Sequence, residues 1–577
     1  MLIIKNANIY SVNLDGTEIR AEAVAADDGK IVYVGSNEGI RDYESSDAKV
    51  IDAQGRTVLP GLCDAHVHAT WSGSAKFSCD LFYLAQTGGK KSIVEKIQER
   101  LCKYIKENPD KKMIKGCGWD YFDFIKALPN KKMIDEVCLD KPVFLESYCQ
   151  HHIWLNSKAL EMAGITKDTP NPHMGLIWRD KNGEPTGLLS EFSAINIVKE
   201  GIPDYDYTVE EYKEIIQIYQ HEYAHAYGVT MIFDALSTEN GKKAYRELAR
   251  EGKLKLRVRD NYYADTAKPR SQFDDMIAEK GSSDVADLYQ QTTVKFFMES
   301  GTPDMYLTRP YNPLALIAMK RPFGHRGFPH WTAAELQEIM PKLADAGFQL
   351  HTHAMGDGSV KHTLDGYINA QNVTGKRTRN VIAHLMLVQP DDFTRMAEND
   401  IIACVQPTWT AMTKGEYATI RLGLGKKRAE QLYPYGRFLK AGVLVSAGTD
   451  FPVMPPPDPF IDMQHAMTRK PCKRFKDYAN SKDFMLAPKK NPAQDLVKLT
   501  DVIKSRTICG AYQSFAEEYA GSIEIGKSAD FAILDRDLFH TPIEDICETK
   551  VMMTIFKGEI VFEREYDHQE RANLHFQ

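Results

Sequence analysis

Several features are missing from this 577-residue sequence, and each absence argues against a class of protein. No run approaches the ~18 consecutive apolar residues of a membrane-spanning helix, and the first residues, MLIIKNANIYSV, lack the small-residue cleavage site of a secretory signal. The net charge is −7 without a long basic block, which argues against nucleic acid or an anionic membrane as a partner. None of the ten cysteines forms a C-x-x-C pair, a usage typical of reduced thiols in a cytoplasmic protein.

The residues that are present divide the chain into three parts. Residues 1–59 alternate apolar and polar residues between turn signals, which predicts a small antiparallel β module. Strand-like stretches return near the other end, in GSIEIGKSADFAILD and VMMTIFKGEIVFE. Because neither end has enough strands for its own sheet, we expect one β-sandwich built from residues 1–59 and 491–577, the latter also holding a terminal helix. The last six residues, ANLHFQ, resemble a tag-protease site and are left out of this prediction.

Between the two ends, over residues 60–490, apolar β-rich runs alternate with helical stretches, and the series begins just before this part. The eight runs are residues 57–66, 229–235, 254–264, 293–300, 347–354, 379–387, 400–408 and 442–450. Strands that alternate with helices form parallel sheets, and eight such units predict a (β/α)8 barrel. The gap after the first run is too long for one loop, so residues of about 75–205 are expected to form an inserted subdomain.

Two short histidine motifs compete for a role in metal binding. HEYAHAYG, at residues 221–228, has the H-E-x-x-H pattern of zinc proteases. On the predicted helix, however, His221 and His225 lie on the side opposite the apolar stripe, so we expect a solvent-exposed face. The longer metzincin form of this motif also requires histidine at position 231, where this chain has Met231. The protease reading is therefore the weaker one.

The second motif, DAHVHAT at residues 64–70, is joined by further potential metal ligands elsewhere in the sequence. His66 and His68 are two residues apart, so in a strand their side chains leave the same face. Later predicted strands bring further ligand-type residues: Lys295 in the fourth, His353 in the fifth, His384 in the sixth and Asp450 at the end of the eighth. Functional residues gather where barrel strands end, and four histidines with one aspartate suit a divalent ion, zinc first.

These segments also carry a resemblance to a known family. LPGLCDAHVH, HHIWLNSKAL, GVTMIFDA, VKFFMESG, HTHAMGDGSV, IAHLML, AGTDFPV and GSIEIGKSADFAILD together resemble the amidohydrolase superfamily, in particular its YtcJ-like branch, amidohydrolase family 3, which includes N-substituted formamide deformylases. The resemblance covers nearly the whole chain. It implies a metal-dependent hydrolase barrel with a β-sandwich, acting on carbon–nitrogen bonds other than peptide bonds.

The resemblance also implies roles for individual residues. His66 and His68 would bind a first metal with Asp450, and His353 and His384 a second. Lys295 stands where the superfamily can use a carboxylated lysine to bridge both ions; its simpler role is a barrel lysine paired with an acid such as Glu299. One or two ions remain possible. A metal-activated hydroxide would attack a carbonyl carbon, with Asp450 as general base and then acid, and one metal with a nearby histidine would stabilise the oxyanion.

Substrate contacts are less constrained by the sequence. We expect Asp357 to orient a ligand histidine or the start of the next helix, and His151 of the insert to reach over the site towards a substrate oxygen. Trp119, Phe297 and Trp409 are candidate walls of a pocket for a small molecule with a hydrophobic or aromatic group. Hydrolysis of an ester or lactone, deamination, a non-catalytic scaffold and the H-E-x-x-H protease are the alternatives, and a homodimer is possible.

Overall fold

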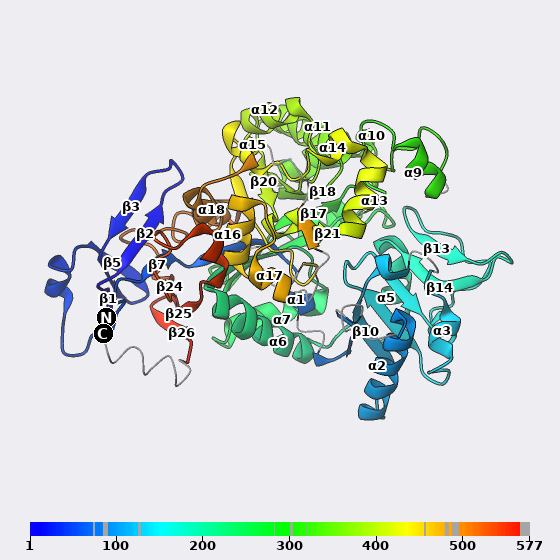
Figure 1. Ribbon diagram of the computed structural model, residues 1–577, viewed down its shortest axis with the longest axis horizontal. Coiled ribbons are helices and arrows are strands. Elements are labelled where there is room, and N and C mark those ends of the chain that lie inside the picture. Colours follow the sequence, from blue (N-terminus) through cyan, green and yellow to red (C-terminus); the bar gives the residue numbers. More distant parts are fainter. Residues whose placement is uncertain are drawn as a thin grey trace.

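The computed structural model describes residues 1–72, 76–82, 84, 91–124, 128–281, 283–300, 304–319, 321–454, 457–478, 484–486 and 495–565. Three parts lie in a row: a sandwich of two sheets, a central barrel and an inserted subdomain with a sheet of its own (Figure 1). The expected tag-like residues 572–577 lie outside the described residues.

The central sheet has eight parallel strands in the order β22-β20-β19-β18-β17-β16-β15-β8. They are β8 (Leu62–Val67), β15 (Val229–Asp234), β16 (Arg257–Tyr263), β17 (Tyr289–Phe297), β18 (Gln349–Ala354), β19 (Val381–His384), β20 (Ile402–Val405) and β22 (Val445–Ala447). The two edge strands meet through backbone hydrogen bonds, because Asp450 N donates to His66 O at 2.8 Å and His68 N donates to Phe451 O at 2.8 Å. The predicted eight-stranded barrel is therefore confirmed as a nearly closed one.

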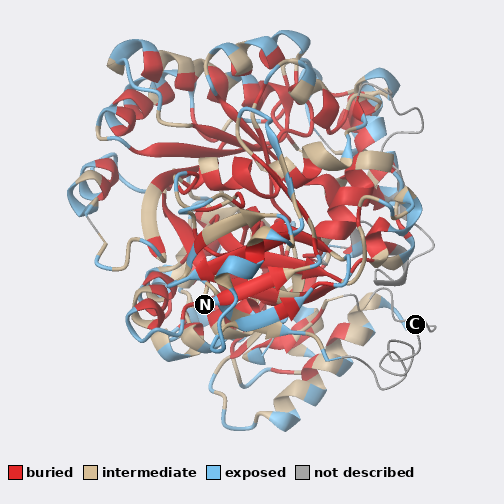
Figure 2. Ribbon diagram, turned by 90° about the vertical axis from the view of Figure 1, so that its left-hand side faces the viewer, coloured by how far each residue is buried: buried red, intermediate tan, exposed pale blue. Residues whose placement is uncertain are grey.

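Helices cover the outside of this barrel. They include α6 (Val209–Ile218), α7 (Glu239–Arg250), α8 (Gln272–Glu279), α10 (Ala333–Asp345), α11 (Asp357–Thr374), α12 (Pro390–Glu398), α15 (Tyr435–Lys440), α16 (Pro459–Thr468), α18 (Leu499–Ser505) and α19 (Ile508–Gln513). Local sequence sets where they begin: α6 starts with a capping box of Thr208 and Glu211, and α10 with one of Thr332 and Glu335. Buried strands and inward helix faces share one large apolar core (Figure 2).

The two ends of the chain do combine into one β-sandwich. A four-stranded sheet holds β5 (Lys30–Gly35), β4 (Ala23–Asp27), β1 (Leu2–Lys5) and β6 (Lys49–Asp52), and a six-stranded sheet holds β26 (Glu559–Glu563), β25 (Val551–Phe556), β24 (Phe531–Leu534), β7 (Thr57–Pro60), β2 (Asn8–Val12) and β3 (Glu18–Ala21). Apolar residues of both sheets, among them Ile4, Ile9 and Phe531, form their shared core. The antiparallel expectation for residues 1–59 was wrong in part, because β1 pairs with β6 and β2 with β7 in parallel across longer connections.

The insert follows β8 and has its own six-stranded sheet. Its strands are β9 (Cys79–Asp80), β10 (Ile114–Trp119), β11 (Val143–Ser147), β12 (His152–Leu155), β13 (Leu176–Arg179) and β14 (Pro185–Ser190), with the helices α2 (Ile93–Glu107), α3 (Lys131–Asp135), α4 (Ser157–Met162) and α5 (Phe192–Gly201). It lies on the side of the barrel opposite the sandwich (Figure 1).

Within the described residues, no helix combines the length and low polarity needed to cross a bilayer. The cytoplasmic location and the homodimer stay predictions from the sequence.

Candidate metal centre

Three side chains from the two ends of the barrel sequence meet at its mouth. Oδ1 of Asp450 lies 3.3 Å from Nε2 of His66 and 3.2 Å from Nε2 of His68. All three residues are buried, and among the described residues they form the one group of three or more His, Cys, Asp or Glu side chains whose ligand atoms all lie within 4.8 Å of one another. The predicted H-x-H pair and the distant aspartate therefore share one point in space.

The backbone around Asp450 explains this meeting. The loop after β22 passes so close to β8 that a Cβ atom at Gly448 would lie 2.5 Å from His66 N, so only glycine fits there. Asp450 has φ 60°, in the left-handed region that aspartate tolerates better than most residues. This turn, together with the hydrogen bond from Asp450 N to His66 O, aims the carboxylate at the two imidazoles.

His353 and His384 lie directly beside this group. Their ring centroids are 4.3 Å apart, and the ring of His384 is 4.9 Å from that of His66. Both residues are buried at the ends of neighbouring parallel strands, β18 and β19. His384 has φ 77°, a strained conformation for a residue that is not glycine, and such strain is concentrated at functional sites.

The electrostatics of the cluster suit a cation. Burial lowers the pKa of all four histidines, to about 3 for His384, so the rings are neutral and have lone pairs available. Burial alone would raise the pKa of Asp450, but its contacts with His66 and His68 hold that pKa well below the ordinary value, so the carboxylate is ionised. Neutral imidazoles and a carboxylate are typical ligands of zinc.

The cluster also has unmet bonding capacity. Oδ1 of Asp450 and Nε2 of His353 are buried and form no well-aligned hydrogen bond with the described part of the chain. Buried polar atoms are normally paired, because leaving one unpaired costs free energy. The residues therefore fit a divalent metal as the missing partner, and they fit it better than a closed hydrogen-bond network.

Lys295 lies at the base of the cluster. It is fully buried on β17, and its Nζ is 3.5 Å from Nε2 of His66 and 5.0 Å from the centroid of the Phe297 ring. Burial lowers its pKa to about 7, although Asp450 opposes this effect. The alternative pairing with Glu299 is wrong, since Glu299 accepts hydrogen bonds from backbone N–H groups and no ion pair of Lys295 is found among the described residues.

Glu299 instead fixes the loops around the mouth. Its carboxylate accepts from the backbone N–H groups of Tyr306, at 2.6 Å, Gly356, at 2.8 Å, and Met355. A Cβ at Gly356 would lie 2.1 Å from Tyr306 O, so this packing requires glycine. Burial raises the pKa of Glu299 to about 7 despite these bonds. Its structural role could not be read from the sequence, because its partners are backbone atoms of other loops.

Asp357 does not touch a histidine of the cluster. It begins α11, and its carboxylate accepts from Thr308 N at 3.0 Å, from Thr308 Oγ1 at 2.6 Å and from Nε2 of Gln389. The expectation that Asp357 orients a ligand histidine was wrong, whereas its place at the start of α11 agrees with the alternative that it belongs to the start of the next helix. Asp357, which follows β18, ties together the loops after β17 and β19, whose strands carry Lys295 and His384.

One supporting residue was missed. His351 was not among the predicted site residues, yet its Nε2 lies 2.9 Å from Nδ1 of His66, and it is buried. Residues 351–353 repeat the H-x-H spacing on one strand, so both rings face the barrel interior. That repeated spacing was the available signal. His351 holds the ring of His66 in place, as partners of metal-binding histidines commonly do.

The H-E-x-x-H stretch has no such arrangement. α6 ends at Ile218, and residues Tyr219–Ala224 continue as one π-helical turn, which rotates the following residues. His221 and Glu222 are exposed, whereas His225 is buried with its Nε2 2.9 Å from Lys255 O. The expectation of one solvent face for both histidines was therefore wrong, because it assumed a regular helix.

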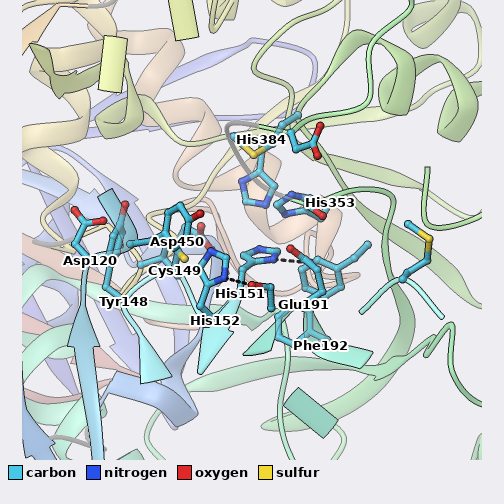
Figure 3. Close-up of a pocket in the computed structure, with 18 of the residues that line it drawn as sticks. Asp120, Tyr148, Cys149, His151, His152, Glu191, Phe192, His353, His384 and Asp450 are labelled. Carbon is cyan, nitrogen blue, oxygen red and sulfur yellow. Dashed lines mark hydrogen bonds and ion pairs between the residues drawn. The ribbon is translucent and has the colours of Figure 1, made fainter. Parts of the chain in front are cut away.

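The candidate metal centre forms the floor of a cavity of about 650 Å³. Phe297, Trp409 and His151 line it, as do Trp71, Trp178 and Phe192. Trp409 stacks on His384 with a centroid distance of 5.1 Å (Figure 3 shows His384 above His151). Trp119 is not among the residues that line the cavity. Its ring is buried against Phe124 and Trp154 and its Nε1 donates to Leu145 O at 2.8 Å, so it belongs to the core of the insert.

Comparison with known proteins assigns the chain to a family. The sequence model that describes the amidohydrolase family matches residues 49–562 of the chain. The chain belongs to the amidohydrolase family. It is therefore a hydrolase of carbon–nitrogen bonds other than peptide bonds, with a barrel built to hold a metal ion.

Individual relatives agree over the full length. The N-substituted formamide deformylase of Arthrobacter pascens is 26% identical over 572 residues, 98% of each chain. YtcJ of Bacillus subtilis (strain 168) is 26% identical over 96% of this amidohydrolase and 98% of its own length. The crystal structure of an uncharacterized metal-dependent hydrolase from Pyrococcus horikoshii OT3 has a TM-score of 0.69, covers 94% of this chain and 99% of its own, and at 23% identity supports the fold.

Proposed function

We propose that this amidohydrolase cleaves the amide bond of a small molecule that carries a hydrophobic or aromatic group. The observation that supports this proposal is the meeting of His66, His68 and Asp450 on the floor of a cavity with aromatic walls. The donor set favours zinc as the ion. Metal analysis of the purified protein distinguishes one bound ion, held by His66, His68 and Asp450, from two, with the second at His353 and His384.

Asp450 is the proposed proton carrier. A bound divalent ion would supply acidified water and a polarised carbonyl. The Asp450 carboxylate is ionised, so it can take a proton from the water that attacks the carbonyl carbon. It would then deliver that proton to the leaving nitrogen as the carbon–nitrogen bond breaks. The products are a carboxylic acid and an amine, and the carboxylate is regenerated.

Lys295 is the proposed site of N6-carboxylation. An ammonium group cannot bind a metal, so Lys295 must lose its proton before it can take part. Its pKa of about 7 makes the neutral amine available at neutral pH. That amine would add to CO2 and release a proton, which leaves a carbamate with two oxygen ligands. Its place beside Nε2 of His66 supports the proposal.

The aromatic walls of the cavity favour a substrate that carries a hydrophobic group. Phe297 lines the cavity from the end of β17, Phe192 from the start of α5 and Trp409 from a short 3-10 helix, and the rings of Phe192 and Phe297 are 4.7 Å apart. Pockets with apolar walls and a few polar groups bind ligands whose chemistry is similarly divided. Because a full-length relative is an N-substituted formamide deformylase, N-substituted formamides are the first class to test.

The direct test is an assay of zinc-reconstituted protein with two matched substrates. 4-Nitroformanilide, an aromatic formamide that would be split into formate and 4-nitroaniline, is compared with formamide itself. We expect kcat/KM to favour the aromatic substrate by at least about 10-fold, the scale of one to two buried apolar contacts. Turnover of only small or charged amides would rule out the hydrophobic group, and turnover of only the matching phenyl ester would favour the esterase alternative.

A further inference from the structure

The cavity contains a second pair of polar groups, and both come from the insert. Nδ1 of His151, just before β12, lies 3.0 Å from Oε2 of Glu191, between β14 and α5 (dashed line in Figure 3). Both side chains line the cavity and are nearly buried, with exposed fractions of 11% and 12%. Burying an ion pair costs free energy, because its charges lose their hydration. The presence of such a pair in the cavity therefore indicates a functional role.

The backbone at Glu191 is strained to form this pair. Glu191 has φ 71° and ψ 152°, a region used almost only by glycine. The strained residue is held on both sides: its N–H donates to His151 O at 2.8 Å, and its own carbonyl accepts from Ala194 N and Ile195 N at the start of α5. A residue kept in this conformation without being glycine indicates that its side chain is needed.

The pair leaves one nitrogen of His151 for the cavity. Nδ1 is occupied by Glu191, and Nε2 has no hydrogen bond to the described part of the chain. The His151 ring lies 5.9 Å from that of His353 and 6.2 Å from that of Phe297. Burial alone would lower the pKa of His151, but the Glu191 charge raises it, which favours a ring that carries a hydrogen on Nε2 as well as on Nδ1.

We propose that Glu191 is a positioning residue that holds His151 with its Nε2 towards the oxygen of a substrate bound at the metal centre. The inference rests on the proposed function, in which that substrate is an amide. It adds that the insert completes the active site, because the barrel supplies the proposed metal ligands and the insert supplies the group that faces them. Hydrogen bonds to charged groups are about twice as strong as neutral ones. The negative charge of Glu191 should therefore hold His151 more firmly than a neutral side chain of the same shape.

A double-mutant cycle tests whether Glu191 acts through His151. Zinc-reconstituted wild type, Glu191→Gln, His151→Ala and the double variant are assayed with 4-nitroformanilide. We expect Glu191→Gln to lower kcat by about 10- to 100-fold, the usual effect of losing such a supporting partner, with KM within about threefold. In the His151→Ala background the same change should lower kcat no further. Additive losses, or an unchanged kcat in Glu191→Gln, would overturn the inference.

A binding measurement separates this inference from the proposed function. Calorimetric titration of the same four proteins with benzohydroxamate, whose oxygens bind zinc and whose ring fits an aromatic cavity, needs no turnover. We expect about 10-fold weaker binding in Glu191→Gln, and no further loss in the double variant. If the wild type fails to cleave any amide while this pattern holds, the proposed function fails and the inference stands. If amides are cleaved but the binding losses add, the inference fails alone.

Two controls keep the result readable. Glu161→Gln makes the same substitution on an exposed residue of α4 in the same insert, and we expect unchanged kcat and benzohydroxamate affinity. Zinc content and melting temperature are measured for every variant. Should Glu191→Gln fail to fold, Glu191→Asp, which keeps the charge but withdraws it by one methylene, takes its place in the cycle with the same expected non-additivity.

Discussion

Two histidine pairs in this chain share residue types but not surroundings. His66 on the barrel strand β8 and His68 directly after it meet Asp450, a residue almost four hundred positions away in sequence, within 3.3 Å. His221 and His225 stand on a helix, and the structure separates them, one exposed and one buried against Lys255 O. Spacing alone therefore does not make a metal site. What distinguishes the pairs is whether other strands bring further ligands to the same point.

Among substitutions that keep the size of the side chain, the largest effect is expected from removing the charge of Asp450, which contacts both histidines of the first pair. Asp450→Asn keeps the shape of the side chain but removes its charge and its capacity to carry a proton. We expect kcat to fall by about 10²–10⁴-fold, the range of general acid–base contributions, together with weaker zinc binding. Steady-state assays and metal analysis of the purified variant check both. An Asp450→Asn enzyme with near-normal kcat would refute the proposed role of this carboxylate.

Lys295→Met tests the base of the same cluster. Methionine fills a similar volume but cannot form a carbamate, so we expect a loss of about 10- to 100-fold in kcat/KM and a lower zinc content. ¹³C NMR of wild type prepared with ¹³C-bicarbonate should show a carbamate signal that is absent in the variant. Full activity of the variant, or no such signal in the wild type, would leave Lys295 as a core lysine.

The second pair should matter for stability in acid. Burial lowers the pKa of His225 from 6.5 to about 4, so the folded protein binds this proton more weakly than the unfolded chain. Stability is therefore full above the unfolded pKa and is lost as pH falls towards 4. Between pH 7 and 5 we expect a contribution of roughly 2 kcal/mol to this loss. His225→Gln should remove that part of the pH dependence in urea unfolding, whereas His221→Gln, on the exposed neighbour, should not.

The smallest effect is expected at the residue that a protease would need most. Glu222 is exposed on the π-helical turn. Glu222→Gln should change amide hydrolysis by no more than about twofold, as for most surface substitutions. His66→Ala, assayed beside it, should abolish both activity and zinc binding. If the two results were exchanged, the protease reading of HEYAHAYG would be restored and the metal centre at the barrel mouth abandoned.

For the two histidine pairs and the strands around them, prediction from sequence succeeded where the structure depends on residues close together in the chain. Short-range periodicity predicts the eight barrel strands and the common face of His66 and His68. In a (β/α)8 barrel the carboxyl ends of all strands lie at one mouth, so the side chains there are brought together. The irregular turn after Ile218 defeated the helical-face argument for His225, because a single π turn changes the register of everything after it. The parallel pairing of β1 with β6 was also missed, since pairing depends on partners outside the local pattern.

The sequence by itself determined the fold class, the family and the residues able to bind a metal, because these depend on periodicity and on residue chemistry. Only the tertiary structure decided how they are used. It placed Trp119 in the core of the insert, set Asp357 to tie two loops, and brought His351 against His66 and Glu191 against His151. Such contacts join side chains from separate strands and loops, and their existence depends on how the whole chain packs.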